Sequence, residues 1–290
     1  MINSANLLKR MREFMLTQDE WFKAICESYT NPPVFHNGLE LPGFPSDQIQ
    51  ANTTGQAGIN TLKEAFVFYQ DCIENFKSLG TPIQPENSLL DFGVGWGRIS
   101  RFFLREVPLD NIYGLDVMDD FVTICKQTFR NDNFQVTTPF PPTQIPDEKF
   151  NFIVGYSVFS HLSENACSSW MREFSRLLAP GGIVALTTRG RTFFDYCESL
   201  KGKGQTGYSG ALSKMFDDFS DARKRYDQGE FVHSNQEGVN GGGAMTADFY
   251  GETFIPEQYA KSAYSEQFVL EKFLFDPARQ SHPIMFFRKK

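Results

Sequence analysis

The chain has 290 residues, a formal net charge of -7 at pH 7 and a pI near 5.2, and 41% of its residues are hydrophobic. This length fits one large domain or one and a half, and the hydrophobic share is ample for a globular core. The acidic charge argues against broad attraction to nucleic acid or to anionic membranes, so small molecules or neutral glycans are the expected partners.

The cysteines and histidines also limit the class of protein. Five cysteines are scattered along the chain without a C-x-x-C pair, which fits reduced thiols better than a disulfide framework. The four histidines are far apart in the sequence, so we expect no bound metal. No window approaches the length of a membrane span. We therefore expect a cytoplasmic protein.

The first 85 residues are expected to form a cap of helices and loops. Apolar residues recur at helical spacing over 2–29. Prolines and glycines over 31–60 predict a long irregular connection, and such loops often act as lids. A helix is predicted from Thr61 to about Ser78, with Thr61 as its N-cap and Glu64 at the capping-box position.

Residues 88–104 predict a strand, a turn almost without side chains, and a helix. Glycines in such a turn let the backbone approach a ligand closely, while the first N–H groups of the helix attract its negative part. The dinucleotide fingerprint G-x-G-x-x-G would require a glycine at position 98, but that residue is Arg98. A second strand, 111–116, ends in Asp116, about 20 residues later, where such folds place an acid for ribose hydroxyls.

From residue 86 onward, strands and helices alternate, which predicts a parallel sheet with helices on both faces. Further strands are expected at 134–138, 150–155 and 183–187, and helices at 119–130 and 166–178. Residues 191–249 interrupt this alternation, with charged helical material around 212–227. The chain closes with a helix at 256–265 and strands at 268–275 and 283–287, whose short connection favours an antiparallel pair.

Two blocks of the chain resemble class I S-adenosylmethionine-dependent methyltransferases. The first is D-x-G-x-G-x-G, formed by Asp91, Gly93, Gly95 and Gly97; the second joins Ser-Val-Phe-Ser-His-Leu at 157–162 to Leu-Leu-Ala-Pro-Gly-Gly at 177–182. The resemblance covers 86–190. It implies a Rossmann-like α/β fold with a seven-stranded, mostly parallel sheet, an antiparallel last strand and helices on both faces, and S-adenosylmethionine as the cofactor.

The resemblance also implies how the chain is divided. We expect an N-terminal helical cap at 1–85, the cofactor-binding core at 86–190, an insertion after the fifth strand at 191–249 that acts as a substrate lid, and a closing helix with two strands at 250–290. Two positions depart from the family pattern. Asn151 stands where many relatives have Asp, and Thr137 and Thr138 stand near where an acid often contacts the adenine amino group.

The residues expected to bind the cofactor follow from these motifs. Asp91 is expected to organise the loop and the cofactor's amino group, and Arg98 to pair with the cofactor carboxylate, with Asp91 or with another acid. An aromatic ring at Tyr156 would stabilise a sulfonium by about 0.5–2 kcal/mol, or it is ordinary packing. The full set is Asp91, Gly93, Gly95, Trp96, Gly97, Arg98, Asp116, Val117, Thr138 and Tyr156.

His161 is the first candidate for a general base. It follows the fourth strand at the edge where open α/β sheets bind ligands, and the ordinary histidine pKa near ~6.5 suits proton transfer at neutral pH. The alternative is a histidine that caps the next helix or hydrogen-bonds in the core. Other candidates for contact with the acceptor lie in the expected lids: His36, His233, Tyr250 and Glu252.

The expected activity is in-line transfer of a methyl group to the oxygen or nitrogen of a small-molecule or glycan-related acceptor. The segment 250–254 resembles a feature of sugar-linked bacterial relatives. The alternatives are a cofactor-binding partner without catalysis and, on the same fold, an NAD(P)-dependent oxidoreductase. Methylation of DNA amino groups is disfavoured, because Gly-Tyr-Ser-Val at 155–158 lacks the required Asn/Asp-Pro-Pro-aromatic motif. The acceptor, the methylated atom and the oligomeric state stay open.

Overall fold

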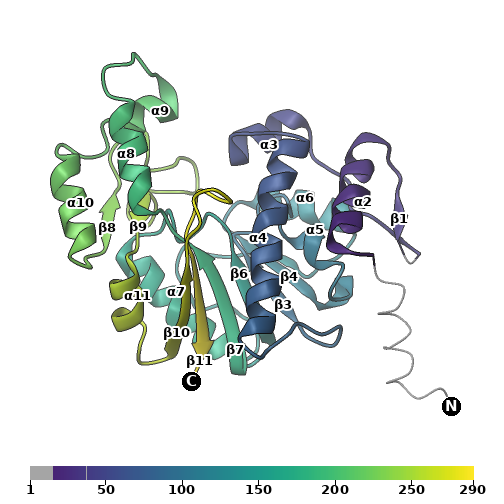
Figure 1. Ribbon diagram of the computed structural model, residues 1–290. Coiled ribbons are helices and arrows are strands. Elements are labelled where there is room, and N and C mark those ends of the chain that lie inside the picture. Colours follow the sequence, from purple (N-terminus) through teal and green to yellow (C-terminus); the bar gives the residue numbers. More distant parts are fainter. Residues whose placement is uncertain (1–15, 37) are drawn as a thin grey trace.

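The computed structural model describes residues 16–36 and 38–290 and is built around a seven-stranded sheet (Figure 1). The strand order is β10-β11-β7-β6-β3-β4-β5. Strands β3 to β7 run parallel, and β11 is antiparallel to both of its neighbours, as predicted. The strands are β3 (Leu89–Phe92), β4 (Ile112–Asp116), β5 (Phe134–Val136), β6 (Phe150–Gly155), β7 (Leu178–Thr187), β10 (Phe268–Leu274) and β11 (Ile284–Lys289).

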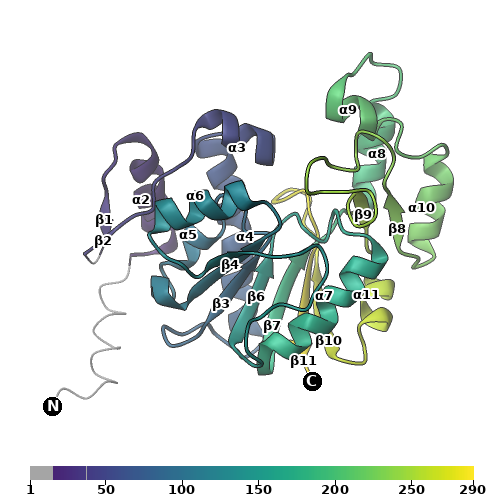
Figure 2. The same cartoon turned by 180° about the vertical axis from the view of Figure 1, so that it is seen from behind.

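Helices cover both faces of this sheet and enclose two apolar cores. Alternate side chains of β6 serve the two faces, since Phe152 and Val154 belong to one core and Ile153 to the other. Figure 1 shows α4 in front of the sheet, and the reverse view in Figure 2 shows α7 in front. The first face is covered by α2 (Gln18–Thr30), α4 (Ile59–Ser78), α5 (Ser100–Phe103) and α6 (Asp119–Phe129), the second by α7 (Glu164–Leu177) and α11 (Glu257–Ala263). A short 3-10 helix, η1 (Leu109–Asn111), precedes β4.

The N-terminal cap differs from its prediction first in the connection over residues 31–60. These residues are not wholly irregular, because they contain helix α3 (Asp47–Thr54) and a hairpin of two short strands, β1 (Phe35–His36) and β2 (Leu39–Glu40). Helix α3 is short and polar, so it lacks the apolar stripe by which helices are recognised. Its ends carry ordinary caps, Ser46 at the start and the left-handed Gly55 at the end. The predicted helix over 2–29 is confirmed in α2, and its first half lies outside the described residues.

The predicted start of the next helix was wrong. Helix α4 begins at Ile59, with Gly58 as its N-cap. Thr61 is therefore inside the helix and fully buried, and neither Thr61 nor Glu64 caps it. Both side chains instead bind Arg98, so their spacing reflects a tertiary contact.

The insertion after β7 forms a layer of its own over the carboxyl edge of the sheet. It contains α8 (Arg191–Ser199), α9 (Gly207–Leu212), α10 (Phe219–Asp227) and β8 (Val232–Ser234), which pairs with β9 (Glu252–Phe254). This pairing crosses the expected boundary between residues 249 and 250. Phe194 and Phe254 stack at 3.8 Å in a small separate core. Figure 1 shows the insertion, in green, across from the N-terminal cap, in blue and purple.

None of the helices in the described part of the chain has the length and apolarity that crossing a bilayer requires.

Candidate functional site

A cavity of about 280 Å³ lies at the carboxyl ends of β3, β4 and β6. Its walls are the glycine loop after β3, residues 115–118 at the end of β4, and the segment 156–162 after β6. Two further segments, called the two caps below, complete it. The N-terminal cap contributes residues 52–54 of α3, and the insertion with the residue that follows it contributes Met245, Phe249 and Tyr250. This is the edge at which parallel α/β sheets bind ligands, so the cavity is the candidate site.

The glycine loop and Asp116 are joined by a hydrogen bond at this edge. Gly95 has a φ of +53° and donates its N–H to Oδ2 of Asp116 at 2.8 Å, while Met118 N–H donates to Oδ1 at 2.9 Å. Burial raises the pKa of Asp116, and these backbone N–H groups oppose the rise. A carboxylate has about four lone-pair sites, so Asp116 can still accept bonds from ligand hydroxyls. A Cβ at Gly95 would lie 3.8 Å from Cγ2 of Thr53, another residue of the cavity lining.

Asp91 organises the loop from behind the cavity rather than from its wall. Its side chain is 1% exposed, and Oδ2 accepts hydrogen bonds from the N–H and the hydroxyl of Ser100 at 3.0 and 2.7 Å. These bonds hold the start of α5 against the end of β3. Burial, opposed by Ser100, raises the pKa of Asp91 to about 7.

This raised pKa predicts a pH-dependent effect of Asp91→Asn on stability. The pKa rises from its ordinary value of 3.8 to about 7 in the folded protein, so ionising Asp91 destabilises the fold increasingly from about pH 4 to pH 7. Asparagine avoids ionisation but can still accept from Ser100. We therefore expect the free energy of unfolding of Asp91→Asn, measured with urea, to rise relative to that of wild type by about 2–4 kcal/mol as the pH goes from 4 to 8. A difference that does not change with pH would contradict this reading; Asp110→Asn, at an exposed position, is the control.

Arg98 is held by α4 and borders the cavity. Its Nη1 donates to Thr61 Oγ1 at 2.9 Å and pairs with Glu64 at 2.6 Å, so the acid that it binds is Glu64 and not Asp91. The guanidinium lies 5.0 Å from the ring centre of Tyr156, which also lines the cavity. Arg98 thus links the N-terminal cap to the loop.

Not all predicted cofactor residues reach the cavity. Thr138 lies outside its lining and donates its hydroxyl to the carbonyl of Phe140, whereas the neighbouring Thr137 lines it. Gly97 also lies outside, and a Cβ there would approach Phe129 to 2.3 Å, so this glycine permits helix packing. The predicted residues within the lining are Gly93, Gly95, Trp96, Arg98, Asp116, Val117, Tyr156 and His161.

His161 is fixed by a segment that is distant in the sequence. Residues 249–253 run along 160–163, with Gly251 N–H donating to the carbonyl of His161 at 2.7 Å and Thr253 N–H to that of Ser160 at 2.8 Å. The ring of Tyr250 stacks parallel to the imidazole, with their centres 5.0 Å apart. The segment that follows the insertion therefore packs against His161.

The partners of His161 determine which ring nitrogen carries the proton. Nδ1 lies 2.9 Å from the carbonyl oxygen of Gly251 and 3.1 Å from Oε1 of Glu252, and both are acceptors. Nδ1 must therefore carry hydrogen, which leaves the lone pair of the neutral ring on Nε2. Nε2 is 3.5 Å from the hydroxyl of Ser157, another cavity residue. The basic nitrogen of His161 thus faces Ser157 of the cavity lining.

Glu252, which the sequence offered as a candidate for contact with the acceptor, instead contacts His161. Two other partners of Glu252 were not identified from the sequence. Arg189 and Tyr208 both bind Glu252. Neither carries a sequence motif, and the only available signal was their position beside the end of β7 and in the insertion. Of the other histidines, His233 bonds to Thr253 and lies outside the lining, and His36 packs against Trp21. In the described ranges, no group of three or more His, Cys, Asp or Glu side chains is suited to a metal ion.

Comparison with known proteins finds one family model that matches the core of this chain. Residues 89–182 match the family model described as a methyltransferase domain. This match covers the glycine loop, Asp116 and His161, and it does not extend to the caps. A search of curated proteins finds no match.

Solved structures with a similar arrangement include three described as methyltransferases. A putative S-adenosylmethionine-dependent methyltransferase from Listeria monocytogenes is 10% identical, with 77% of this chain and 98% of that chain covered and a TM-score of 0.49. A structure described as S-adenosylmethionine-dependent methyltransferases from Methanosarcina mazei is 18% identical, with 75% of this chain and 96% of that chain covered and a TM-score of 0.46. A putative sarcosine dimethylglycine methyltransferase from Galdieria sulphuraria is 13% identical, with 94% of this chain and 98% of that chain covered and a TM-score of 0.47. Likeness at this level carries no argument about the acceptor.

Proposed function

We propose that this chain, whose residues 89–182 match the family model of a methyltransferase domain, uses S-adenosylmethionine and transfers its methyl group to a hydroxyl of a small-molecule or glycan-related acceptor. The observation that carries the choice of a hydroxyl is the orientation of His161. Its hydrogen-bearing Nδ1 is held by Gly251 and Glu252, and its basic Nε2 lies beside Ser157 of the cavity lining.

The cavity residues fit the cofactor. The Asp116 carboxylate would accept bonds from ribose hydroxyls, and the backbone at Gly93 and Gly95 allows close approach of the methionine part. Val117 and Thr137 would border the adenine, and Thr137 would take the role first expected for Thr138, because Thr137 lines the cavity and Thr138 does not. The cofactor, when bound, supplies a methyl group on a positively charged sulfur. Tyr156, which lines the cavity, would offer an aromatic ring toward such a charge.

His161 would act as the general base. A hydroxyl acceptor must lose its proton during methylation, and a base within hydrogen-bond reach contributes typically 10²- to 10⁴-fold. Nε2 can take that proton because Nδ1 is already committed as a donor. An amine acceptor arrives with a free lone pair and needs no such base. The His161 arrangement therefore favours O-methylation over N-methylation.

The two caps would exclude water from the reaction. Thr53 of α3 and Met245 and Phe249 of the insertion border the same cavity from opposite sides. Holding both reactants in a dry, near-attack arrangement is the main catalytic means of such a site, worth up to ~7–11 kcal/mol in well-oriented cases. We therefore assign a substrate-lid role to the insertion, 191–249.

The proposal is tested by matched pairs of acceptors that differ only in the reacting atom. Purified protein with S-adenosylmethionine is offered phenol and aniline derivatives of one scaffold, and methyl glycosides with the corresponding amino sugars, and methylated product is measured by mass spectrometry. We expect product from hydroxyl members only, with the His161→Gln variant strongly impaired. Methylation of the amine members with equal rates in wild type and His161→Gln would contradict the proposal.

A further inference from the structure

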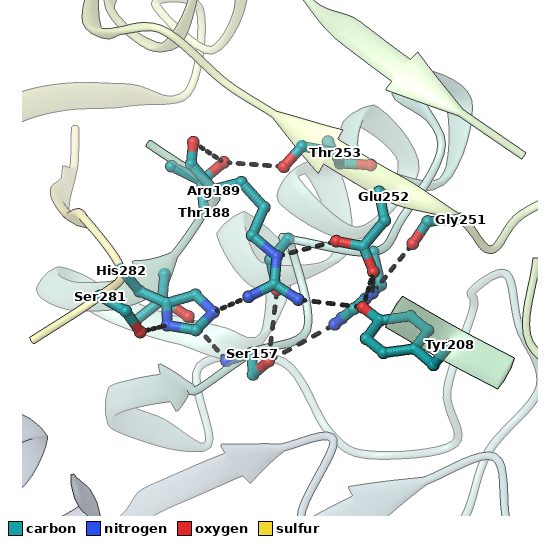
Figure 3. A network of polar contacts seen from close by, with 12 residues as sticks. Ser157, Thr188, Arg189, Tyr208, Gly251, Glu252, Thr253, Ser281 and His282 are labelled. Carbon is teal, nitrogen blue, oxygen red and sulfur yellow. Dashed lines mark hydrogen bonds and ion pairs between the residues drawn. The ribbon is translucent and has the colours of Figure 1, made fainter. Parts of the chain in front are cut away.

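The carboxylate beside His161 belongs to a buried polar network that is larger than a two-residue pair (Figure 3). Glu252 is fully buried, and each of its oxygens has a partner other than solvent. Oε2 accepts from Nε of Arg189 at 2.8 Å. Oε1 lies 3.1 Å from Nδ1 of His161 and also accepts the hydroxyl hydrogen of Tyr208. Burial alone would raise the pKa of Glu252, but the facing His161 and Arg189 hold it well below its usual range.

Arg189 is fixed at all three of its nitrogens. Besides Nε, its Nη1 donates to Nε2 of His282 at 2.7 Å and its Nη2 to the hydroxyl of Tyr208 at 3.3 Å (Figure 3). Because a guanidinium can only donate, His282 accepts through Nε2 and bears its hydrogen on Nδ1, next to Ser281 at 2.9 Å. The guanidinium also lies 4.1 Å from the ring centre of Phe193 in α8. Arg189 therefore stays in place beside Glu252.

The balance of charge in this network bears on the state of His161. Glu252 alone would orient the imidazole and would also stabilise its protonated, catalytically useless form. The positive charge of Arg189 neutralises Glu252, and the hydroxyl of Tyr208 donates a hydrogen bond to Oε1, the oxygen that faces His161. Both contacts weaken the pull of the carboxylate on the proton without moving it.

We propose that Tyr208 of the insertion and Arg189 are positioning residues that hold Glu252 so that it orients His161, while they weaken the pull of this carboxylate on the imidazole proton. Tyr208 lies in α9, so the insertion does more than cover the cavity: its docking completes the surroundings of the base. This inference rests on the proposed role of His161, and it adds the regulation of that group by a segment outside the methyltransferase domain.

Other charged and titratable groups also surround His161, and the test must separate them from Tyr208. They come from the strand after the insertion, from β8, from the turn before β11 and from the end of β7. These groups are Glu252, Tyr250, His233, His282 and Arg189. All of them are left intact by Tyr208→Phe, which removes one hydroxyl and keeps the ring.

The experiment follows the His161 imidazole by NMR in the full chain, assigned by its loss in His161→Gln, and titrates wild type and Tyr208→Phe from pH 4.5 to 9. Without the hydroxyl, the carboxylate holds the imidazole proton more strongly, so we expect the titration midpoint to rise by about 0.5–1 pH unit. The acid limb of the rate profile should move by the same amount. Tyr196→Phe is the matched control, since Tyr196 is in the insertion and is 50% exposed against 48% for Tyr208.

A midpoint unchanged in Tyr208→Phe, or displaced equally in Tyr196→Phe, would overturn the inference. The NMR readout needs no acceptor, so its outcome is separate from that of the proposed function. If Tyr208→Phe leaves the midpoint unchanged while His161→Gln abolishes hydroxyl methylation, the role of Tyr208 fails and the proposed function stands. If His161→Gln retains full activity, the proposed base fails, and with it this inference.

Discussion

Replacing His161 by glutamine is expected to lower kcat for a hydroxyl acceptor about 10²- to 10⁴-fold, the usual contribution of a general base. Glutamine can still donate to the carbonyl of Gly251, in place of the Nδ1–H that donates at 2.9 Å, but it offers no basic nitrogen to the cavity. The loss should therefore appear in kcat with little change in cofactor affinity. Steady-state rates at saturating S-adenosylmethionine, with calorimetric cofactor binding alongside, measure both quantities.

His233→Gln is the matched control for this substitution. His233 lies in β8, bonds through Nδ1 to the hydroxyl of Thr253 at 2.7 Å, and is not part of the cavity wall. Burial lowers its pKa to about 4, so it is neutral at pH 7 in the folded protein. We expect its variant to keep kcat within a few-fold of wild type. Equal losses in the two variants would show that the effect of His161→Gln is structural.

The fold of the core could be predicted because its signals are local. The apolar run before Asp91, the glycine turn and the apolar run of β6 each lie within a few consecutive residues, and the alternation of strands and helices indicates the parallel sheet. Strand β11 could be placed antiparallel because its connection to β10 is short. Those predictions of fold class and sheet are confirmed. The cofactor roles assigned to individual residues stay predictions.

The caps could not be predicted as well, because long-range contacts determine them. Thr61 and Glu64 have the spacing of a capping box, yet they bind Arg98, which is more than 30 positions away in the sequence. Helix α3 has too few apolar residues to show a periodic pattern, and it is nevertheless part of the cavity wall.

The surroundings of His161 illustrate the same limit. Glu252 is 91 positions from His161, and Tyr208 reaches it only through the folded insertion. The sequence placed Glu252 in an expected lid, and only the structure brings its carboxylate to Nδ1. Arg189 follows β7 directly, but one arginine without a motif gives no sign that its three nitrogens are all engaged. Charge networks of this kind depend on tertiary pairing, so they could not be predicted from spacing.

Removing the carboxylate of Asp116 is expected to abolish cofactor binding. Asp116 fixes Gly95 at 2.8 Å and is the acid placed for ribose hydroxyls, so Asp116→Ala loses both the ligand contact and the order of the loop. Hydrogen bonds to a charged group contribute about 1.5–3 kcal/mol each, and two of them correspond to an affinity loss of about 10²-fold or more. Asp119→Ala, at an exposed position at the start of α6, is the control and should bind as wild type does.

Calorimetric titration of purified wild type, Asp116→Ala and Asp119→Ala with S-adenosylmethionine and, separately, with NADH tests the cofactor site most directly. We expect S-adenosylmethionine to bind wild type and Asp119→Ala but not Asp116→Ala, and NADH to bind none of them. Failure of folded wild-type protein to bind S-adenosylmethionine, or binding that survives Asp116→Ala unchanged, would contradict the assignment of this cavity to the methyl donor.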